Sequence, residues 1–285
     1  MLNLCNVSEM KALLGEYGFH FSKAKGQNFL TAAWVPERIA EEAGVDETAA
    51  VLEIGPGIGA LTQQLCLRAG RVLAVEVDNS LRPILARTLS EFDNLEIRFA
   101  DAMKLDLAQL VAEQFSGLRP LACANLPYYI TSPVLTKLLE SRAFEAVTVM
   151  VQKEVAQRIC AAPGSTDYSA FSVFCRYYAE PEILFEVPPS CFLPQPKVTS
   201  AVLTLRVRTE PPCEIADEAM FFRVVRAAFA QRRKTLSNAL AAGFPERTKA
   251  ELTDCIVACG HAPTVRGETL SIPEFAALSR AIAER

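Results

Sequence analysis

The sequence predicts an α/β fold with a parallel sheet followed by a small helical domain, and three features lead to this prediction. Short apolar runs alternate with helical patterns, which is the order of βαβ units. A glycine-rich turn follows the first of these runs, Val51–Ile54. After Pro211–Pro212 no strand-like run remains and only helical periodicity continues. We therefore expect one domain over residues 1–210 and a helical domain over residues 211–285.

The first forty residues predict two helices separated by a polar loop. Asn6 and Glu9 have the spacing of a capping pair at the start of a helix. The apolar residues that follow at helical spacing are Met10, Leu13, Leu14 and Tyr17. The polar segment 22–28 interrupts this pattern, and a second helix is expected from about Pro36.

The sheet is expected to continue through four more strands and to end in an antiparallel pair. The further strand-like runs are Arg71–Val77, Leu95–Ala100, Pro120–Ala124 and Ala146–Val151. Two later runs, Glu182–Val187 and Ser200–Val207, lie closer together, which favours a hairpin at one edge of the sheet. In the C-terminal domain, a capping box at Ser271–Glu274 predicts the last helix.

The composition is that of an ordinary globular protein. Hydrophobic residues make up 51% of the 285 residues and the mean hydropathy is +0.18, which excludes a disordered chain. No apolar stretch reaches membrane-spanning length and the first ten residues lack a secretory pattern, so we expect a cytoplasmic protein. The nine cysteines are scattered without a CxxC pair and only two histidines occur, so we expect reduced thiols and no metal site.

The charge of the chain is unevenly distributed. The net charge is −4 and the pI about 5.5, which alone argues against a nucleic-acid partner. Within residues 221–250, however, one acid, Glu246, is outnumbered by seven cations: Arg223, Arg226, Arg232, Arg233, Lys234, Arg247 and Lys249. A basic face on an acidic protein can bind phosphate, although a solvated helix face is the other interpretation of such a run.

Three features of the sheet predict a nucleoside pocket. Gly55, Gly57 and Gly59 follow a strand and precede a helix, where glycine lets the backbone turn sharply and approach a ligand. Glu76 ends the next strand, at the position that bonds ribose hydroxyls in doubly wound folds. Asp101 ends the third and can accept a bond from an adenine amine. Each acid alone could be a helix cap; together they indicate NAD or S-adenosylmethionine.

The segment Asn125-Leu126-Pro127-Tyr128 decides between these two ligands. It ends the fourth strand and resembles the motif of methyltransferases that act on exocyclic amino groups. The Asn125 oxygen and the Leu126 or Pro127 carbonyl could accept both N–H bonds of an aromatic amine and direct its lone pair at a methyl donor. Tyr128 could stack on the base, worth about 1–3 kcal/mol. The alternative is a simple turn after a strand.

A second aromatic residue, Phe192, lies in the proline-rich loop 188–198. Proline stiffens this loop, so Phe192 could cover the other face of an extruded base. The alternative is a hydrophobic plug beneath the loop.

The chain resembles the small-subunit ribosomal RNA adenine N6,N6-dimethyltransferase (KsgA/RsmA) family over almost its whole length. The motifs that carry the resemblance are Lys25-Gly-Gln-Asn28-Phe-Leu30, Glu53-Ile-Gly-Pro-Gly57, Asn125-Leu-Pro-Tyr128, Val151-Gln-Lys-Glu154, Phe192-x-Pro-x-Pro-x-Val198 and Phe229-x-Gln-Arg-Arg-Lys-Thr-Leu236. One departure is Tyr129, where many relatives carry a small polar residue; we interpret it as variation around the pocket.

The resemblance implies a Rossmann-like class I methyltransferase sheet with an N-terminal helical extension and a helical C-terminal domain. It implies S-adenosylmethionine as co-substrate, without a metal. The residues implied in donor binding are Gln27, Asn28, Leu30, Gly55, Gly57, Glu76, Asp101, Ala102 and Asn125. Those expected at the reaction centre are Asn125, Leu126, Pro127, Tyr128 and Phe192. Those expected to bind RNA are Arg223, Arg226, Arg232, Arg233 and Lys234.

The family's reaction places two methyl groups on each of two adjacent adenosines, in a hairpin near the 3′ end of small-subunit (16S) rRNA. The implied partner is an immature 30S particle late in ribosome assembly, with no membrane, and the enzyme is expected to be a monomer. In-line displacement at about 3–3.5 Å would need positioning rather than a strong base.

Four other functions would account for only part of the sequence. A large-subunit rRNA dimethyltransferase of the macrolide-resistance type usually lacks the proline at Pro56 and has Phe at the position of Tyr128. A DNA adenine methyltransferase does not explain the segment 231–236. An NAD-dependent dehydrogenase leaves the segment 125–128 unexplained. A docking protein without catalysis conflicts with the intact Asn125 and the two strand-end acids.

Overall fold

The computed structural model describes residues 2–21 and 26–284, so Lys25 of the first motif lies outside the described residues. Backbone contacts divide the chain into two compact units, residues 1–156 with 180–207 and residues 157–179 with 208–285. The segment 157–179 thus groups with the C-terminal helices, although the sequence analysis placed it before the predicted boundary at 210. The two domains as predicted, 1–210 and 211–285, remain a prediction about folding units.

Helices and strands of the described chain have the following bounds. The helices are α1 Val7–Glu16, α2 Trp34–Glu42, α3 Ala60–Cys66, α4 Arg82–Thr88, α5 Leu107–Gln114, α6 Thr131–Glu140, α7 Lys153–Cys160, α8 Ala170–Tyr178, α9 Glu218–Ala230, α10 Leu236–Gly243, α11 Lys249–Ala258 and α12 Ile272–Ala283. The strands are β1 Phe29–Leu30, β2 Ala49–Ile54, β3 Arg71–Glu76, β4 Leu95–Phe99, β5 Arg119–Asn125, β6 Ala146–Gln152, β7 Ala179–Val187, β8 Phe192–Leu193 and β9 Ser200–Val207.

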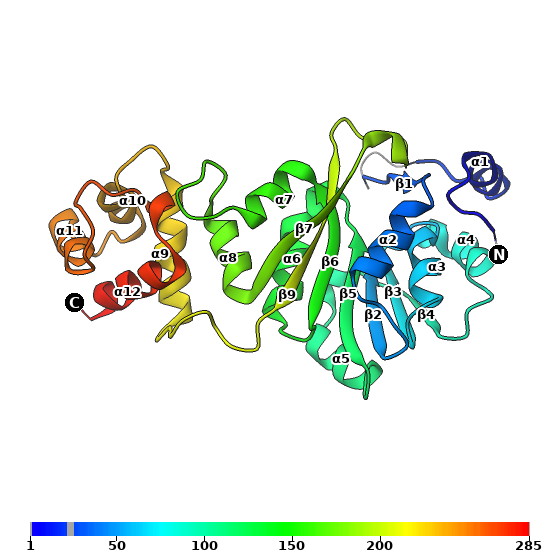
Figure 1. Cartoon of the computed structure of the whole chain (residues 1–285), viewed down its shortest axis with the longest axis horizontal. Coiled ribbons are helices and arrows are strands. Elements are labelled where there is room, and N and C mark those ends of the chain that lie inside the picture. The colour runs from blue at the N-terminus through cyan, green and yellow to red at the C-terminus, as the bar shows by residue number, and fades with distance from the viewer. Residues whose placement is uncertain (1, 22–25, 285) are drawn as a thin grey trace. The chain divides into compact units, whose positions relative to one another are not determined.

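The first unit is built on a seven-stranded sheet of order β4-β3-β2-β5-β6-β9-β7. Strands β2 to β6 pair in parallel, which confirms the predicted parallel sheet. Strand β9 runs antiparallel to β6, and β7 lies beyond it, so both late strands are at one edge as expected. All six residues of β2 are buried, because helices flank the sheet; α2 and α3 lie over its near side in Figure 1.

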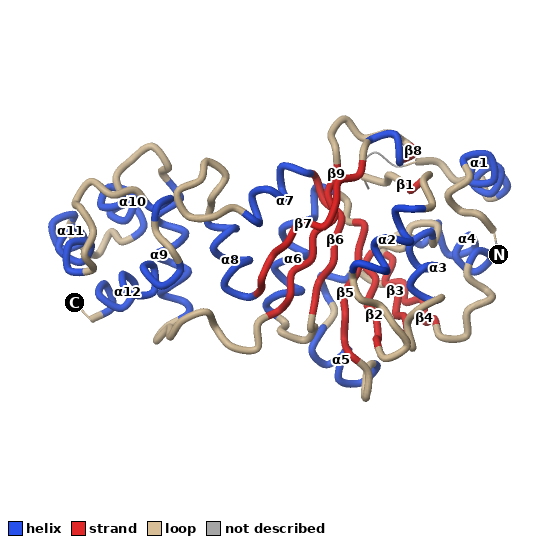
Figure 2. The backbone as a smooth tube through the Cα atoms, in the orientation of Figure 1, coloured by secondary structure: helices blue, strands red, loops and turns tan. Residues whose placement is uncertain are grey.

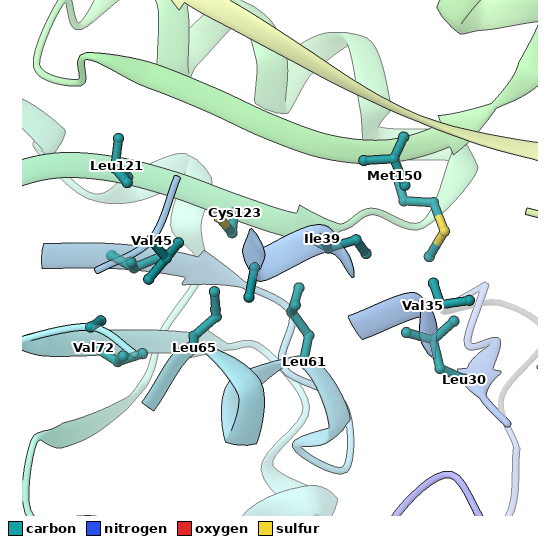
Figure 3. Packing of buried hydrophobic residues seen from close by; sticks show 14 of the residues in the cluster. Leu30, Val35, Ile39, Val45, Leu61, Leu65, Val72, Leu121, Cys123 and Met150 are labelled. Carbon is teal, nitrogen blue, oxygen red and sulfur yellow. The ribbon is translucent and has the colours of Figure 1, made fainter. Parts of the chain in front are cut away.

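The main core of this unit lies between α2, α3 and the sheet. Ile39 of α2 and Leu65 of α3 are fully buried and face strand residues including Val72 and Cys123 (Figure 3). Each such aliphatic side chain contributes about 1.5–3 kcal/mol on burial. Cys123 serves here as a small apolar residue, and burial raises the pKa of its thiol. The packing fixes β2, β3 and β5, whose ends carry the glycine turn and the reaction motif.

The predicted helix starts are confirmed in both units. Asn6 Oδ1 accepts the N–H groups of Ser8 (2.9 Å) and Glu9 (3.2 Å) and so caps α1. The Glu9 carboxylate accepts from Asn3 N (3.2 Å) rather than from Asn6. The capping box at α12 is complete, because Glu274 accepts from both the backbone N–H and the hydroxyl of Ser271.

The second unit contains helices, among them α8 to α12, joined by loops; Figure 2 draws the helices in blue and the loops in tan. Tyr168 is fully buried in it, packs edge-on against Phe229 at 5.6 Å between ring centroids, and donates its hydroxyl to Leu270 O at 3.1 Å. Among the described residues, no helix is both long and apolar enough to cross a membrane.

Candidate active site

A cavity of about 260 Å³ opens at the carboxyl ends of β2, β3 and β5. The strand order reverses between β2 and β5, and this is where open α/β sheets bind ligands. The structure brings together at this cavity every residue that was predicted to bind the donor: Gln27, Asn28, Leu30, Gly55, Gly57, Glu76, Asp101, Ala102 and Asn125. Leu126, Pro127 and Tyr128 line it as well.

The glycine turn that forms the floor of the cavity needs glycine for two different reasons. Gly55, Gly57 and Gly59 all have φ in the left-handed region, at 73°, 60° and 97°. At Gly57 a Cβ atom would also lie 3.1 Å from the Phe29 ring of β1. The turn therefore lets the N-terminal segment pack closely against the end of β2.

Glu76 braces this turn from the neighbouring strand. Its Oε2 accepts from Gly57 N (3.3 Å) and its Oε1 from Asp78 N (2.8 Å). Burial raises the pKa of this carboxyl, the backbone N–H groups oppose the rise, and the charge of Asp78 adds to it. Glu76 therefore sits in the cavity wall with a fixed orientation; its bond to a ribose remains a prediction.

Asp101 caps a short helix and also lies at the cavity, while its bond to an adenine amine stays a prediction. Its carboxylate accepts from Met103 N (2.9 Å) and so caps the short 3-10 helix Ala102–Lys104, as the capping interpretation predicted. Asp101 and Ala102 also line the cavity, on the side formed by β4.

The N-terminal segment 26–30 is tied to the cavity from both sides. Gln27 Nε2 donates to Asp78 Oδ2 at 2.9 Å, which links the segment to the end of β3. Asn125 Nδ2 donates to Asn28 O at 3.4 Å, which links it to the end of β5. The bond to Asn28 directs the Asn125 amide nitrogen to this segment, and the amide oxygen takes no part in it.

The rest of the reaction motif is held by the sheet. Leu126 is buried and its N–H bonds Met150 O of β6 at 3.3 Å. The Tyr128 hydroxyl is paired with Ser200 Oγ of β9 at 2.8 Å, and burial raises its pKa. The ring of Tyr128 is thereby fixed at the cavity, whereas Tyr129 is 63% exposed at its rim.

Phe192 is not brought to the cavity. It belongs to β8, which lies beside β1 in Figure 2 and pairs with it. The register of this pair places Phe192 opposite Leu30. Its side chain is 2% exposed and packs in the core cluster with Leu30 and Val35. Phe192 therefore matches the alternative interpretation, a hydrophobic plug beneath the loop. We correct the expectation that Phe192 provides a second stacking face, because the pairing of β8 with β1 turns its ring into the core.

Two acids of the cavity had no role assigned from the sequence. Glu53, at the end of β2, is 1% exposed and lines the cavity. It begins the motif Glu53-Ile-Gly-Pro-Gly57, but the sequence analysis gave it no role of its own. Asp78 accepts from Gln27 and caps the 3-10 helix Asn79–Leu81 through Ser80 N (3.1 Å). The signal for Asp78 was its position two residues after Glu76 at a strand end.

The predicted RNA-binding cations fall into two groups. Arg223 is held by Glu246 (2.7 Å) and lies over the Phe244 ring, and Arg232 donates to Thr166 O and Tyr168 O. Arg226, Arg233 and Lys234 are exposed, and they have no such ties within the part of the chain that the structure describes. RNA binding by all five residues stays a prediction, and Arg223 and Arg232 differ from the other three in having partners within the chain.

Comparison with known proteins decides the family. The family model described as ribosomal RNA adenine dimethylase matches residues 18–261. The chain belongs to this family. It is therefore an S-adenosylmethionine-dependent rRNA methyltransferase, and its α/β fold is that of rRNA methyltransferases.

Relatives match it over nearly their full length. The ribosomal RNA small subunit methyltransferase A of Geobacillus thermodenitrificans is 46% identical, over 95% of this chain and 94% of the relative. The protein of that name from Alkaliphilus metalliredigens is 43% identical over 100% of both. A solved dimethyladenosine transferase from Plasmodium falciparum has a TM-score of 0.72 at 25% identity, covering 87% of this chain and 95% of that one. The 23S rRNA methyltransferase ErmE has a TM-score of 0.66 at 26% identity, covering 90% and 100%.

Proposed function

We propose that this enzyme transfers methyl groups from S-adenosylmethionine to the N6 amines of two adjacent adenosines in a hairpin near the 3′ end of small-subunit rRNA. The product is N6,N6-dimethyladenosine. The observation that carries the proposal is the position of Asn125 and Tyr128 at the end of β5, beside the acidic cavity of β2, β3 and β4. The near-full-length similarity to small subunit methyltransferases supports the choice of RNA.

The residues of the cavity fit a cationic nucleoside donor. The described residues that line it include four acids and no Lys, Arg or His. Glu76 and Asp101 would hold the nucleoside, and the segment 26–30 would cover it. A bound sulfonium donor supplies an electrophilic methyl group to this site.

The chain contributes positioning rather than proton abstraction. The Asn125 oxygen and a carbonyl of residues 126–127 accept the N–H bonds of the target amine, so that its lone pair faces the methyl group. Tyr128, fixed by Ser200, offers a ring on which the base can stack. After a first transfer only one N–H remains, and one of these acceptors is then sufficient. The proton leaves after methyl transfer, so a strong base is not required.

The substrate proposed is an immature 30S particle late in assembly, met by a monomeric enzyme in the cytoplasm. Arg226, Arg233 and Lys234 would contact its phosphates. Arg223 and Arg232 would instead stabilise the helical unit, through the Glu246 carboxylate and the Tyr168 carbonyl respectively. An acidic enzyme with one basic face is suited to binding a structured RNA locally rather than RNA in general.

The deciding experiment is methylation of separated, unmethylated small and large ribosomal subunits, followed by RNA digestion and mass spectrometry of the nucleosides. We expect dimethyladenosine in the small-subunit RNA alone. Product in the large-subunit RNA alone would move the enzyme to the specificity of the ErmE relative. No product in either subunit, with the donor bound, would favour a docking protein.

The Asn125→Ala variant separates chemistry from docking. Because Asn125 supplies an acceptor for the target amine, we expect methyl transfer to fall at least about 100-fold. Binding to the small-subunit particle, measured by cosedimentation, should remain unchanged. If the variant lost particle binding as well, the role assigned to Asn125 would be wrong.

A further inference from the structure

One of the three aromatic rings among the described residues that line the cavity is exposed. Phe29 is 7% exposed and lies against the glycine turn. Tyr128 is half-buried, and its hydroxyl is paired with Ser200. Tyr129, in contrast, is 63% exposed at the rim. An aromatic ring that faces water at the entrance of a cavity offers its apolar face to a ligand that enters.

The position of the Tyr129 ring is fixed by the backbone on both sides of it. Tyr129 lies in the 3-10 helix Tyr128–Ile130, in which Ile130 N donates to Pro127 O at 3.1 Å, and this helix leads directly into α6. The ring also lies against Gly26, because a Cβ atom at Gly26 would be 3.4 Å from two of the ring carbons. The ring is therefore held before any ligand binds, which reduces the ordering cost of stacking on it.

The rings of Tyr128 and Tyr129 are directed to different parts of the site. A 3-10 helix has about three residues per turn, so consecutive side chains point about 120° apart. The Tyr128 hydroxyl reaches Ser200 of β9, whereas the Tyr129 ring reaches Gly26 of the N-terminal segment. A base that stacks on Tyr128 does not stack on Tyr129 as well, so the second ring is available to a second base.

The charge of the cavity favours a contact with the base of that second nucleotide over a contact with its phosphate. Four acids line the cavity, and its described lining residues include no Lys, Arg or His. Such a wall repels RNA phosphates. A neutral aromatic ring avoids this repulsion, because stacking requires only the π-face that every base has.

We propose that Tyr129 binds the nucleotide adjacent to the target adenosine, by stacking on its base at the rim while the target base lies on Tyr128. The inference rests on the proposed function, because it takes the substrate to be RNA with two adjacent adenosines. Tyr129 is then a specificity determinant for the nucleotide on one side of the target. A purine at that position is preferred to a pyrimidine, because it offers the larger surface for stacking.

Two substitutions at Tyr129 form a matched pair that tests this contact. Tyr129→Phe keeps the ring, whereas Tyr129→Leu keeps an apolar side chain without a ring. With saturating S-adenosylmethionine and unmethylated small-subunit particles, we expect Tyr129→Leu to lower kcat/KM for the particle about 5–100-fold, and Tyr129→Phe less than about twofold. The Kd of S-adenosylmethionine, measured by calorimetry, should be the same in both variants as in wild type.

A purely structural role of Tyr129 would give a different result. If the ring only supports Gly26 and the segment that covers the donor, Tyr129→Leu should raise the Kd of S-adenosylmethionine and recover wild-type transfer at saturating donor. That outcome would overturn the inference. Because Tyr129 is exposed, both variants are expected to fold, and thermal unfolding confirms this.

A second arm of the experiment changes the neighbouring nucleotide. Small-subunit particles are assembled with either of the two adenosines replaced by uridine, and methylation of the remaining adenosine is measured by mass spectrometry. In one of the two particles, the uridine should lower kcat/KM of the wild-type enzyme about threefold or more and leave that of Tyr129→Leu unchanged, since this variant has no ring for the missing purine. Equal losses for the two enzymes in both particles would overturn the inference.

These outcomes differ from a failure of the proposed function. Wild-type enzyme that forms no dimethyladenosine in small-subunit particles would overturn the proposed function and this inference together. Wild-type enzyme that forms it, with Tyr129→Leu equally active, would overturn the inference alone.

Discussion

At the scale of single residues, the acids of the cavity serve the fold and the ligand together. Each Glu76 oxygen accepts a backbone N–H, so the carboxylate that faces the cavity is positioned before any ligand binds. Asp78 and Asp101 likewise hold backbone or side-chain donors of adjoining segments. Such prepositioning reduces the ordering cost of binding. Glu53 is the acid whose Oε2 is buried without a hydrogen-bond partner in the described part of the chain.

The raised pKa of Glu53 predicts how the stability of the unliganded enzyme changes with pH. Its pKa is about 4.5 in the unfolded chain and about 8 when folded, so between these values the folded state binds the additional proton. Stability is therefore full below pH 4.5 with respect to this group, and it falls as the pH rises toward 8, by at most about 1.4 kcal/mol per unit.

Urea denaturation at several pH values measures this effect. We expect wild-type enzyme to lose stability between pH 6 and 8, and Glu53→Gln to lose less over the same interval. Equal slopes for the two proteins would show that Glu53 is already ionised in the folded state.

At the scale of elements, the site depends on a two-residue strand pairing and a glycine turn. Strand β1 pairs with β8, and this holds Phe29 against the turn at Gly57. The glycine turn also positions Glu76, because the Gly57 N–H donates to the Glu76 carboxylate. The N-terminal segment, the turn and the end of β3 therefore form one connected wall of the cavity.

Gly57→Ala and Gly55→Ala form a matched pair that tests this wall. Both positions have left-handed φ, so each alanine costs about 1–2 kcal/mol in backbone strain. Only at Gly57 does the new Cβ meet a neighbour, the Phe29 ring at 3.1 Å, while at Gly55 it meets open space. We expect Gly57→Ala to be the less stable by about 1 kcal/mol or more in urea denaturation and to lose more donor affinity. Equal losses would mean that Phe29 does not hold the wall.

At the scale of the whole molecule, the sheet and most of the cavity could be predicted because their signals are local. Buried parallel strands such as β2 are continuous apolar runs, and the carboxyl ends of successive strands meet at one edge. The burial of Phe192 could not be predicted, since it depends on pairing with Leu30, more than 160 residues away. The orphan oxygen of Glu53 likewise depends on what packs around it.

The roles of the cations in residues 221–250 could not be predicted either, for the same reason. Residue type alone does not distinguish a cation that is paired within the fold from one that is exposed to a ligand. Arg223 is engaged by Glu246, whereas Arg226, Arg233 and Lys234 are exposed. If these three contact phosphates, each contact releases counterions and adds about 0.7–0.9 to the slope of log K against log salt. Replacing all three by Gln should therefore lower the slope for binding to the small-subunit particle by about 2–3.

Arg223→Gln is the control for this last prediction. It removes one positive charge from α9, the helix that also carries Arg226, but from a guanidinium that binds Glu246 and Gly243 O. It should cost on the order of 1 kcal/mol of stability and leave the salt slope unchanged. A slope unaffected by the triple substitution would place the RNA-binding face elsewhere. A slope lowered by Arg223→Gln as much as by any one of the three would show that its ion pair opens when RNA binds.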